Sequence, residues 1–363
     1  MAESERFGAY VVHERLGAGG MATVHRASIE LEDDETREVA LKRLLPQFAD
    51  DKRFVDDFIR EAKLAAELQH PNIVRILELG RIGRTYFIAM DLVRGRPLMS
   101  LMRRAFVKQR PVPIGVVIAL MGELLDALEH AHDAQIVHRD LTPTNLIITD
   151  DGHLKIIDFG VAKSLVGSLQ TSSGLAKGKL GYMSMEAING KQVDTRTDIY
   201  SAGIVLWELL ATRRLFRGNS DLEIILAVKD GFIEPPSRYN PGCPRELDDV
   251  VVHALQRSRE DRWSSAGEMR DAILALHRDY PAGANDVVRW MESLRIGSPP
   301  PPELDEQTEI SDNDRFAQGS DMEMYDDAEI EPLAEERSPV RRAFLDSDTV
   351  VSADESLERD EPK

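Results

Sequence analysis

The N-terminal quarter of the chain alternates between short apolar strand patterns and a single helical stripe. Strands are predicted over residues 7–13, 22–29, 39–44, 74–79 and 85–90. Between the third and the fourth strand, apolar side chains recur every three or four positions, at Phe54, Phe58, Ala62, Ala65 and Leu68. This spacing is typical of an amphipathic helix. The pattern therefore predicts a small β-rich unit with one helix packed against it.

The next part of the chain follows a helical pattern instead. Long amphipathic helices are predicted around residues 117–128 and over residues 198–210. Shorter helical patterns cover residues 224–228, 247–255 and 269–276. The apolar periodicity stops after Trp290. Together with the β-rich unit, these helices predict a fold of the α+β class.

The C-terminal part differs in composition. Residues 299–302 are four consecutive prolines and predict a stiff, extended linker. Residues 303–363 are rich in Ser, Asp and Glu and poor in aromatics, which is typical of a disordered segment. A short helix that forms on binding a partner is the alternative. We therefore divide the chain into residues 1–93, the β-rich lobe, residues 94–280, the helical lobe, and residues 281–363, the linker and acidic tail.

The net charge of −19 is concentrated in the tail. Residues 281–363 hold 23 Asp and Glu against 8 Lys and Arg, a balance of −15, which leaves −4 for residues 1–280. Because phosphate backbones select basic surfaces, this distribution argues against a nucleic-acid partner. Thr308 and Thr349 lie among the acidic residues, so phosphorylation of either would give the tail a handle for a partner with a phosphothreonine-binding domain. A tail that is only solvated is the alternative.

Composition also limits the setting in which the protein works. The single cysteine, Cys243, excludes an internal disulfide, and no zinc-ligand spacing is present. No signal-peptide pattern is found, and no apolar run reaches the ~18 residues that a membrane span needs. With 42% hydrophobic residues the chain can build a sizeable core. A cytoplasmic protein without a membrane span is expected.

Candidate chemistry is concentrated on two neighbouring loops of the helical part. The first loop contains His138, Arg139 and Asp140, with Asn145 shortly after them, and Asp158 begins an Asp-Phe-Gly sequence 13 residues after Asn145. Phosphoryl transfer requires a protein to position the reactants and to neutralise phosphate charge. Asp158 and Asn145 are candidate Mg²⁺ ligands, and Asp140 is a candidate base for an attacking hydroxyl.

A glycine-rich segment, a lysine and a carboxylate lie upstream. Residues 17–20 read Gly-Ala-Gly-Gly, and glycines let a strand–turn–strand approach phosphates closely. Lys42 ends an apolar strand and is a candidate partner of the α- and β-phosphates. Glu61 lies beside the apolar stripe of the predicted helix, where a carboxylate needs a partner.

The glycine-rich segment, Lys42, the His-Arg-Asp loop with Asn145, and the Asp-Phe-Gly sequence occur in this order and spacing. Together they are strong evidence for a phosphoryl-transfer site. Over about residues 7–279 the chain resembles the protein kinase family, and in particular the bacterial eukaryotic-like (Hanks-type) serine/threonine protein kinases, to whose glycine loop residues 16–24 are similar. The resemblance implies the two-lobed protein kinase fold, followed here by the acidic tail. It also implies ATP and Mg²⁺ as cofactors, proteins as substrates, and transfer of the γ-phosphoryl group of ATP to Ser/Thr hydroxyls.

The resemblance assigns site residues as well. Glu61 becomes the ion-pair partner of Lys42, and residues 90–93 become the hinge whose backbone bonds the adenine edge. The nucleotide-binding set is Leu16, Gly17, Ala18, Gly19, Gly20, Val24, Ala40, Lys42, Glu61, Met90, Asp91, Val93 and Ile147. The catalytic set is Asp140, Lys42 and Lys179, with Asn145 and Asp158 as the metal ligands.

Four further residues match structural positions of the family. His138 is expected to pack its loop. Asp198 is expected to brace the backbone of that loop, and it can at the same time cap the helix that it begins. Glu186 and Arg262 are expected to form an ion pair between the end of the activation segment and a late helix.

Regulation by phosphorylation is also implied. Arg139 precedes the candidate base, a position that in the family pairs with a phosphorylated activation segment. Residues 161–180 contain five Ser and Thr hydroxyls, among which Thr171 or Ser173 is the expected site of autophosphorylation.

Three features depart from the family pattern. Ala22 replaces a glycine of the loop, and Met185 replaces a proline in a turn that supports peptide docking. Thr142 stands where the family has a lysine, and Lys179 stands where it has a threonine. Because these two side chains meet beside the catalytic aspartate in the family, the exchange would restore an ammonium near the γ-phosphate from the opposite side. The alternative is that Lys179 points to solvent and the site is weakened.

Two other functions are alternatives to an active protein kinase. A nucleotide-binding pseudokinase that acts as a signalling scaffold would explain Thr142 and Met185. A small-molecule kinase of the same fold is disfavoured, because residues 201–275 resemble the full helical lobe that binds peptides. The presence of every phosphate-handling residue favours the active protein kinase.

Overall fold

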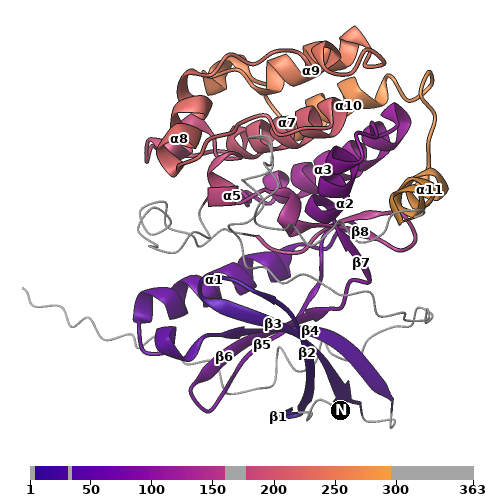
Figure 1. Cartoon of the computed structure of the whole chain (residues 1–363). Coiled ribbons are helices and arrows are strands. Elements are labelled where there is room, and N and C mark those ends of the chain that lie inside the picture. Colours follow the sequence, from indigo (N-terminus) through magenta and orange to yellow (C-terminus); the bar gives the residue numbers. More distant parts are fainter. Residues whose placement is uncertain (1–4, 32–34, 160–176, 296–363) are drawn as a thin grey trace, which may run out of the picture.

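The computed structural model describes residues 5–31, 35–159 and 177–295 of the 363-residue chain. Figure 1 shows two stacked lobes, a sheet-rich lobe that holds the N-terminal strands and a larger helical lobe. The predicted α+β class, with a β-rich lobe followed by a helical lobe, is confirmed. Within the described ranges, no helix is both long enough and apolar enough to cross a membrane.

The smaller lobe is built on a six-stranded antiparallel sheet in the order β1-β2-β3-β4-β6-β5. Its strands are β1 (Glu5–Phe7), β2 (Tyr10–Ala18), β3 (Ala22–Glu30), β4 (Thr36–Leu44), β5 (Ile76–Ile82) and β6 (Thr85–Asp91). The strand predicted over residues 7–13 is divided in two, because Gly8 turns the chain at φ +59° and β1 folds back on β2. A glycine adopts this left-handed conformation without steric cost.

One helix, α1 (Lys52–Glu67), packs on this sheet. Phe58 is fully buried and shares a hydrophobic cluster with Leu44 and Ile88 of the sheet. The predicted apolar stripe is therefore the packing face. The same face carries Glu61 into the interior, where its exposed fraction is only 3%.

The larger lobe is mainly helical. Its longer helices are α2 (Leu98–Val107), α3 (Ile114–Asp133), α7 (Arg196–Ala211), α8 (Asp221–Asp230), α9 (Arg245–Ala254) and α10 (Ala266–Leu274). Helix α7 lies at the centre, because every residue from Thr197 to Ala211 is buried, as expected of a helix surrounded by other helices. The helices predicted from the periodicity are present, whereas α2 was not predicted.

A second, three-stranded sheet lies where the lobes meet. It consists of β7 (Gly95–Pro97), β8 (Leu146–Thr149) and β9 (Leu154–Ile156), in that order. The Val74 N–H donates to the Ile156 carbonyl oxygen at 2.8 Å. This bond ties β9 to the smaller lobe, so the loops on either side of the β8–β9 hairpin are held against it.

The helical lobe continues beyond the boundary predicted at residue 280. The segment assigned to the linker includes α11 (Ala284–Arg295), which packs on α2 and α3. Its buried side chains follow a helical spacing, at Val287, Trp290, Met291 and Leu294. A linker that starts at residue 281 is therefore wrong. The predictions made for residues 296–363 lie outside the described part of the chain.

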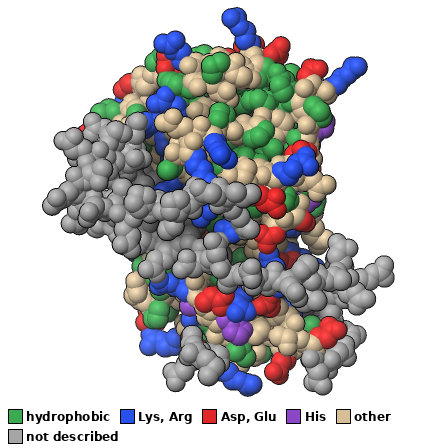
Figure 2. All heavy atoms as spheres, turned by 45° about the vertical axis from the view of Figure 1, so that its right-hand side comes forward, with side chains coloured by type: hydrophobic (Ala, Val, Ile, Leu, Met, Phe, Trp, Pro, Cys, Tyr) green, Lys and Arg blue, Asp and Glu red, His purple; other side chains and the backbone are tan. Residues whose placement is uncertain are grey.

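The surface on the side of α11 is uneven in character. Figure 2 shows hydrophobic side chains grouped on the larger lobe and charged side chains where the two lobes meet. A cavity of about 670 Å³ lies between α3, α10 and the connection to α11, with His153, Arg270 and Val287 in its wall. Among the described residues that line it, none belongs to the predicted nucleotide or catalytic set. This cavity is separate from the predicted site.

Candidate active site

The glycine-rich segment forms the turn between β2 and β3. The Gly19 N–H donates to the Ala22 carbonyl oxygen at 2.8 Å and closes the turn. A Cβ added at Gly17 or Gly20 would meet no heavy atom of the described chain within 4 Å. The glycines thus border open space, into which backbone N–H groups can receive phosphate oxygens.

Lys42 lies near the end of β4, buried between two carboxylates. Its Nζ donates to Glu61 Oε1 at 2.6 Å and to Asp158 Oδ1 at 2.8 Å. Burial alone would lower the pKa of Lys42, but Asp158 and Glu61 outweigh burial and raise it. Burial raises the pKa of Glu61 against the opposing effect of Lys42, and the nearby Asp158 adds to the rise. One ammonium therefore joins α1 of the smaller lobe to the Asp-Phe-Gly loop of the larger lobe.

Apolar side chains of the smaller lobe lie beside Lys42 and line the predicted adenine slot. Leu16, Ala40 and Met90 belong to one buried cluster of the smaller lobe. Val24 and Val93 are partly buried and pack against this cluster. The arrangement brings together the side chains predicted to hold the flat, apolar faces of an adenine ring.

The opposite wall comes from the larger lobe. Leu146 and Ile148 of β8 belong to the core of that lobe, and side chains alternate along a strand. Ile147, only 4% exposed, therefore points the other way, toward the slot. Ile157 packs against the cluster of the smaller lobe. Sequence reasoning missed it, although its position directly before Asp158 was a usable signal.

The residues of the predicted hinge differ from one another in which of their polar groups are free of other hydrogen bonds in the described chain. The Asp91 N–H donates to the Arg75 carbonyl oxygen at 3.0 Å, and the Asp91 carboxylate pairs with Arg37 at 2.8 Å. Among the described residues, no backbone hydrogen bond uses the N–H or C=O of Val93. The backbone groups of Val93 are therefore available to an adenine edge, whereas the N–H and the carboxylate of Asp91 are engaged in the smaller lobe.

Asp198 holds the loop that carries Asp140 in place through hydrogen bonds to its backbone. The Asp198 carboxylate accepts the backbone N–H groups of His138 at 2.8 Å and Arg139 at 2.9 Å. It also accepts from His132 Nε2 at 2.9 Å. Burial would raise the pKa of Asp198, but the bonds from His132 and His138 outweigh it and hold the pKa below its usual value. The bracing prediction is confirmed and the capping prediction is wrong, because Thr195 is the N-cap of α7.

Two features of this loop follow from that bracing. Arg139 adopts φ 66°, a left-handed conformation that a non-glycine residue keeps only when its surroundings hold it. His138 is fully buried and stacks on Phe159, with ring centroids 4.7 Å apart. The expected packing role of His138 is confirmed.

Asn145, a predicted metal ligand, contacts the predicted base Asp140. Its Nδ2 donates to the Asp140 carbonyl oxygen at 2.8 Å and to Asp140 Oδ2 at 3.2 Å. Because the amide nitrogen is engaged, Oδ1 is the atom that Asn145 can offer to a cation. No group of three or more His, Cys, Asp or Glu side chains that could hold a metal occurs in the described ranges. Asn145 and Asp158 fit Mg²⁺, which commonly takes one or two protein ligands and completes its shell with phosphates and water.

Lys179 reaches the catalytic loop, as the exchange of residue types predicted. Its Nζ donates to Asp140 Oδ2 at 2.9 Å. The Lys179 side chain is 41% exposed and that of Asp140 is 12% exposed, so the contact lies at the mouth of the site. Thr142 is buried and shares a hydrogen bond of 2.6 Å with Thr144. The alternative in which Lys179 points away into solvent is not the arrangement found.

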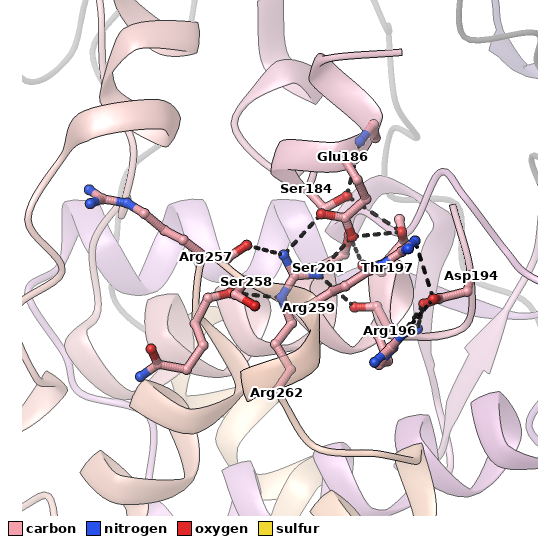
Figure 3. Close-up of polar contacts among 12 residues, drawn as sticks. Ser184, Glu186, Asp194, Arg196, Thr197, Ser201, Arg257, Ser258, Arg259 and Arg262 are labelled. Atoms are coloured by element: carbon pink, nitrogen blue, oxygen red, sulfur yellow. Dashed lines mark hydrogen bonds and ion pairs between the residues drawn. The ribbon is translucent and has the colours of Figure 1, made fainter. Parts of the chain in front are cut away.

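The end of the activation segment is anchored by a buried ion pair (Figure 3). The Arg262 guanidinium donates to both carboxylate oxygens of Glu186, at 2.7 and 3.0 Å. Thr197 of α7 donates to the same carboxylate at 3.0 Å. Arg262 is fully buried and also lies over the ring of Tyr200 at 4.6 Å. The predicted pair is confirmed, and it fixes the chain a few residues after Lys179.

Met185, which replaces the family's proline, begins the short helix α6 (Met185–Ile188). Ser184 caps this helix by accepting the Ala187 N–H at 3.4 Å. A first helical position suits proline and good helix formers alike. Together with the anchored Glu186, the cap keeps the turn ordered despite the substitution.

The predicted site residues are thus brought together from both lobes, with one exception. The activation-segment hydroxyls, including Thr171 and Ser173, lie outside the described residues, as does the phosphorylated partner predicted for Arg139.

Known proteins resemble this chain over its described part. Residues 10–274 match the family described as protein kinase domain. The chain is 36% identical to the tyrosine-protein kinase MasK of Myxococcus xanthus, over 77% of this chain and 44% of that protein. It is 36% identical to the serine/threonine-protein kinase PrkC of Bacillus subtilis, over 73% of this chain and 40% of that protein. For the serine/threonine-protein kinase PknL of Mycobacterium tuberculosis the identity is 34%, over 80% and 69%.

Solved structures agree with this. The crystal structure of the PknI kinase domain of Mycobacterium tuberculosis is 28% identical, with a TM-score of 0.58, and covers 76% of this chain and 99% of that one. The chain thus spans less than half the length of MasK and PrkC but nearly the whole of an isolated kinase domain.

Proposed function

The chain belongs to the protein kinase family, and from this premise we propose that it transfers the γ-phosphoryl group of ATP to Ser or Thr hydroxyls of proteins. The observation that carries the proposal is a pair of side-chain clusters on adjacent loops, which are joined by the bond from the Ile157 N–H to the Asn145 carbonyl oxygen at 3.0 Å. Lys42 with Asp158 and Glu61 forms one cluster, and Asp140 with Asn145 and Lys179 forms the other. The two groups together supply the positioning and charge neutralisation that phosphoryl transfer needs.

ATP binds, in this proposal, with its adenine in the apolar slot and its phosphates under the glycine turn. Lys42 holds the α- and β-phosphates, and Glu61 keeps that ammonium in place. Asn145 and Asp158 hold Mg²⁺, which neutralises charge on the phosphates when bound. Lys42 Nζ lies 2.8 Å from Asp158 Oδ1. The ammonium and the predicted metal ligand are therefore close enough to act on the same phosphate groups.

The chemical step uses Asp140 as base. The substrate hydroxyl gives its proton to Asp140 while its oxygen forms a bond to the γ-phosphorus. The bond from that phosphorus to the β–γ bridging oxygen breaks, and ADP leaves. Asn145 donates to Asp140 Oδ2 at 3.2 Å, which fixes the orientation of the carboxylate before the hydroxyl arrives.

Lys179 supplies the cation that the family usually provides from the position of Thr142. Its Nζ lies 2.9 Å from Asp140, close to where charge develops on the transferring group. Cations held in such a place stabilise the transition state more than the bound substrate. We therefore assign Lys179 a catalytic role.

Serine and threonine are proposed as acceptors because relatives such as PrkC and PknL are serine/threonine-protein kinases by name. MasK, a tyrosine-protein kinase by name at comparable identity, supports tyrosine as the second candidate. The pseudokinase reading loses its main support, because Lys179 restores the missing cation and Met185 leaves its turn ordered.

The proposal includes self-modification in the cytoplasm, where ATP and Mg²⁺ are available. Autophosphorylation within residues 161–180 would give Arg139 a charge-assisted partner and order that segment. Phosphorylation of Thr308 or Thr349 would recruit a partner with a phosphothreonine-binding domain. Both steps follow from the sequence predictions and concern residues beyond the described part.

The test is incubation of the purified full chain with Mg-ATP, followed by mapping of phosphorylated residues by mass spectrometry. We expect phosphate on Ser and Thr of the chain and of an added protein substrate such as casein. Phosphate found only on Tyr would move the acceptor class to the second candidate. ATP binding without any transfer, with or without substrate, would instead support the pseudokinase scaffold.

A further inference from the structure

Helix α8 is apolar on two opposite faces. Ile224 and Val228 are buried against the larger lobe. Leu222 and Leu226 precede them by two positions, about 200° around the helix, and their side chains are 65% and 46% exposed. A helix on a protein surface normally carries one apolar stripe, facing the core. The outer apolar stripe of α8, formed by Leu222 and Leu226, therefore stays exposed in the folded lobe.

Phe232 is a further exposed hydrophobic residue, two positions beyond the end of α8. Its side chain is 87% exposed, the highest value among the exposed large hydrophobic residues of the described chain. Scattered single hydrophobic residues on a surface need no explanation. Leu222, Leu226 and Phe232, which we call the α8 patch, fall within one short helix and its following turn, which is typical of an interaction surface.

The α8 patch is bordered mainly by negative charge. The helix carries Asp221, Glu223 and Asp230 against a single Lys229. Asp230 stands at the C-terminal end of the helix, where the helix dipole disfavours a carboxylate. The nearby Arg257 is bonded to the Gly231 carbonyl oxygen at 2.9 Å. An apolar segment that brings its own positive charges fits this border best.

A second copy of the same face fits poorly. A symmetric dimer places the same patch on both subunits, so the net negative border of one α8 would meet that of the other. Like charges across an interface cost binding energy and reject the wrong partner. The occupant must therefore be a different surface from α8 itself.

The chain contains one such segment, in the tail. Residues 296–363 hold 21 Asp and Glu and only 6 Lys and Arg, and three of these six are Arg337, Arg341 and Arg342. The last two are followed by Ala-Phe-Leu, with Phe344 and Leu345. Arg315 also directly precedes an aromatic residue, Phe316, but this pair has no second arginine and no large apolar residue beside it.

The length of the tail allows it to reach the patch. Residues 296–339 separate α11 from this segment, and a chain of that length can span up to about 145 Å when extended, well beyond the roughly 50 Å diameter of a domain of this size. We propose that residues 340–345 dock on the α8 patch, with Phe344 and Leu345 on Leu222, Leu226 and Phe232 and the two arginines on the carboxylates of α8. The tail is thereby held on the larger lobe.

The docked segment would lie on the outer face of α8, with this helix between it and the chain segment that holds Lys179. The Ile224 side chain is 3.9 Å from where a Cβ of Gly181 would stand, so α8 packs on the chain segment that holds Lys179. Residues 346–356 follow the segment and contain Ser347, Thr349, Ser352 and Ser356. Resting on the proposed function, docking would raise the effective concentration of these hydroxyls at the active site.

Photo-crosslinking of the full chain tests the docking without any use of ATP. The change Phe232→p-benzoylphenylalanine places a photoreactive ring in the patch, and its exposure means that folding does not depend on it. The change Val252→p-benzoylphenylalanine, at a side chain that is 39% exposed on α9, is the matched control. Adducts are located by mass spectrometry after proteolysis.

We expect the Phe232 probe to join residues 338–346, and the adduct to fall about tenfold or more when Arg341→Glu and Arg342→Glu are introduced together. The Val252 probe should give no such adduct. An adduct to α8 of a second chain, an adduct to residues 315–316, or none at all would overturn the proposal. Phosphoryl transfer can succeed or fail independently of these results, so the two proposals are judged separately.

Discussion

The buried pair of Glu186 and Arg262 offers the sharpest test of the packing around the active site. We consider Arg262→Met, which keeps the length of the apolar stem and removes the guanidinium. All five N–H donors of Arg262 are engaged: two by Glu186 and one each by the carbonyl oxygens of Gln256, Arg196 and Arg257. The change leaves a buried carboxylate without its counter-ion.

The expected cost follows from these contacts. Removing one partner of a buried ion pair destabilises a protein by about 3–5 kcal/mol, because the remaining charge is uncompensated. Thr197 still donates to Glu186 at 3.0 Å, which recovers part of this, while the three carbonyl oxygens lose a donor. We expect the free energy of unfolding to fall by about 4 kcal/mol, equivalent to a decrease of roughly 8–16 °C in Tm.

Urea and thermal unfolding, followed by tryptophan fluorescence, measure this loss. The matched control is Arg259→Met: that side chain is 34% exposed and pairs with Asp194 at 3.4 Å and Glu260 at 3.0 Å, so the cost should stay below about 1 kcal/mol. If Arg262→Met costs no more than the control, the reasoning about the buried pair is refuted.

The pH dependence gives a second check on the same pair. Burial would raise the pKa of Glu186, but the bond from Arg262 outweighs it and lowers the pKa. A carboxylate with a lowered folded pKa contributes stability above its unfolded value, about 4.3, and loses it as the pH falls through the folded value. The difference in stability between wild type and Arg262→Met should therefore be full at pH 7 and shrink below about pH 4.

Three further predictions concern the catalytic loop and the domain boundary. Lys179→Ala should lower kcat by about 10²-fold with little change in the KM for ATP, and Thr142→Lys with Lys179→Thr should recover much of the loss; purely additive effects in the double-mutant cycle would mean that the two residues do not communicate. A chain that ends at Arg295 should unfold within a few degrees of the Tm of the full chain, because it loses only the docking of residues 340–345, whereas one that ends at Gly283 should lose several kcal/mol because four buried side chains of α11 are removed; equal Tm values for the two shortened chains would contradict the packing of α11. Asp198→Asn should reduce activity at least about tenfold while circular dichroism stays native, because the amide cannot accept all three of its hydrogen bonds; full activity would show that the loop keeps its shape without the carboxylate.

Long, strongly periodic segments could be predicted from the sequence, since burial of one face dictates their spacing. Helix α1 shows this, with its apolar face on the sheet and Glu61 carried inward beside Lys42. The three strands β7, β8 and β9 escaped prediction because they are only three or four residues long and too short to display a period of two. Helix α11 escaped because the prolines and acidic residues after it dominated the composition, although its apolar stripe was readable.

The site was predictable to the extent that motif and chemistry coincide. Asp140, Asn145 and Asp158 lie close in sequence and need phosphate or metal partners, so their convergence could be expected. The contact of Lys179 with Asp140 crosses 39 residues, and no local pattern encodes it; only the exchange with Thr142 indicated it. The engagement of the Asp91 side chain by Arg37 depends on the register of β4 against β6 and could not be seen beforehand.

The central claim, phosphoryl transfer with Asp158 as metal ligand, is tested most directly by one rate measurement. Transfer of γ-phosphate from Mg-ATP to the chain and to an added protein substrate is compared for wild type, Asp158→Ala and the control Asp150→Ala, an exposed carboxylate on the β8–β9 turn. We expect wild type and control to transfer at similar rates and Asp158→Ala to lose about 10²-fold or more with an unchanged Tm. Near-normal transfer by Asp158→Ala would contradict the metal assignment, and absence of transfer by wild type would contradict the proposed activity itself.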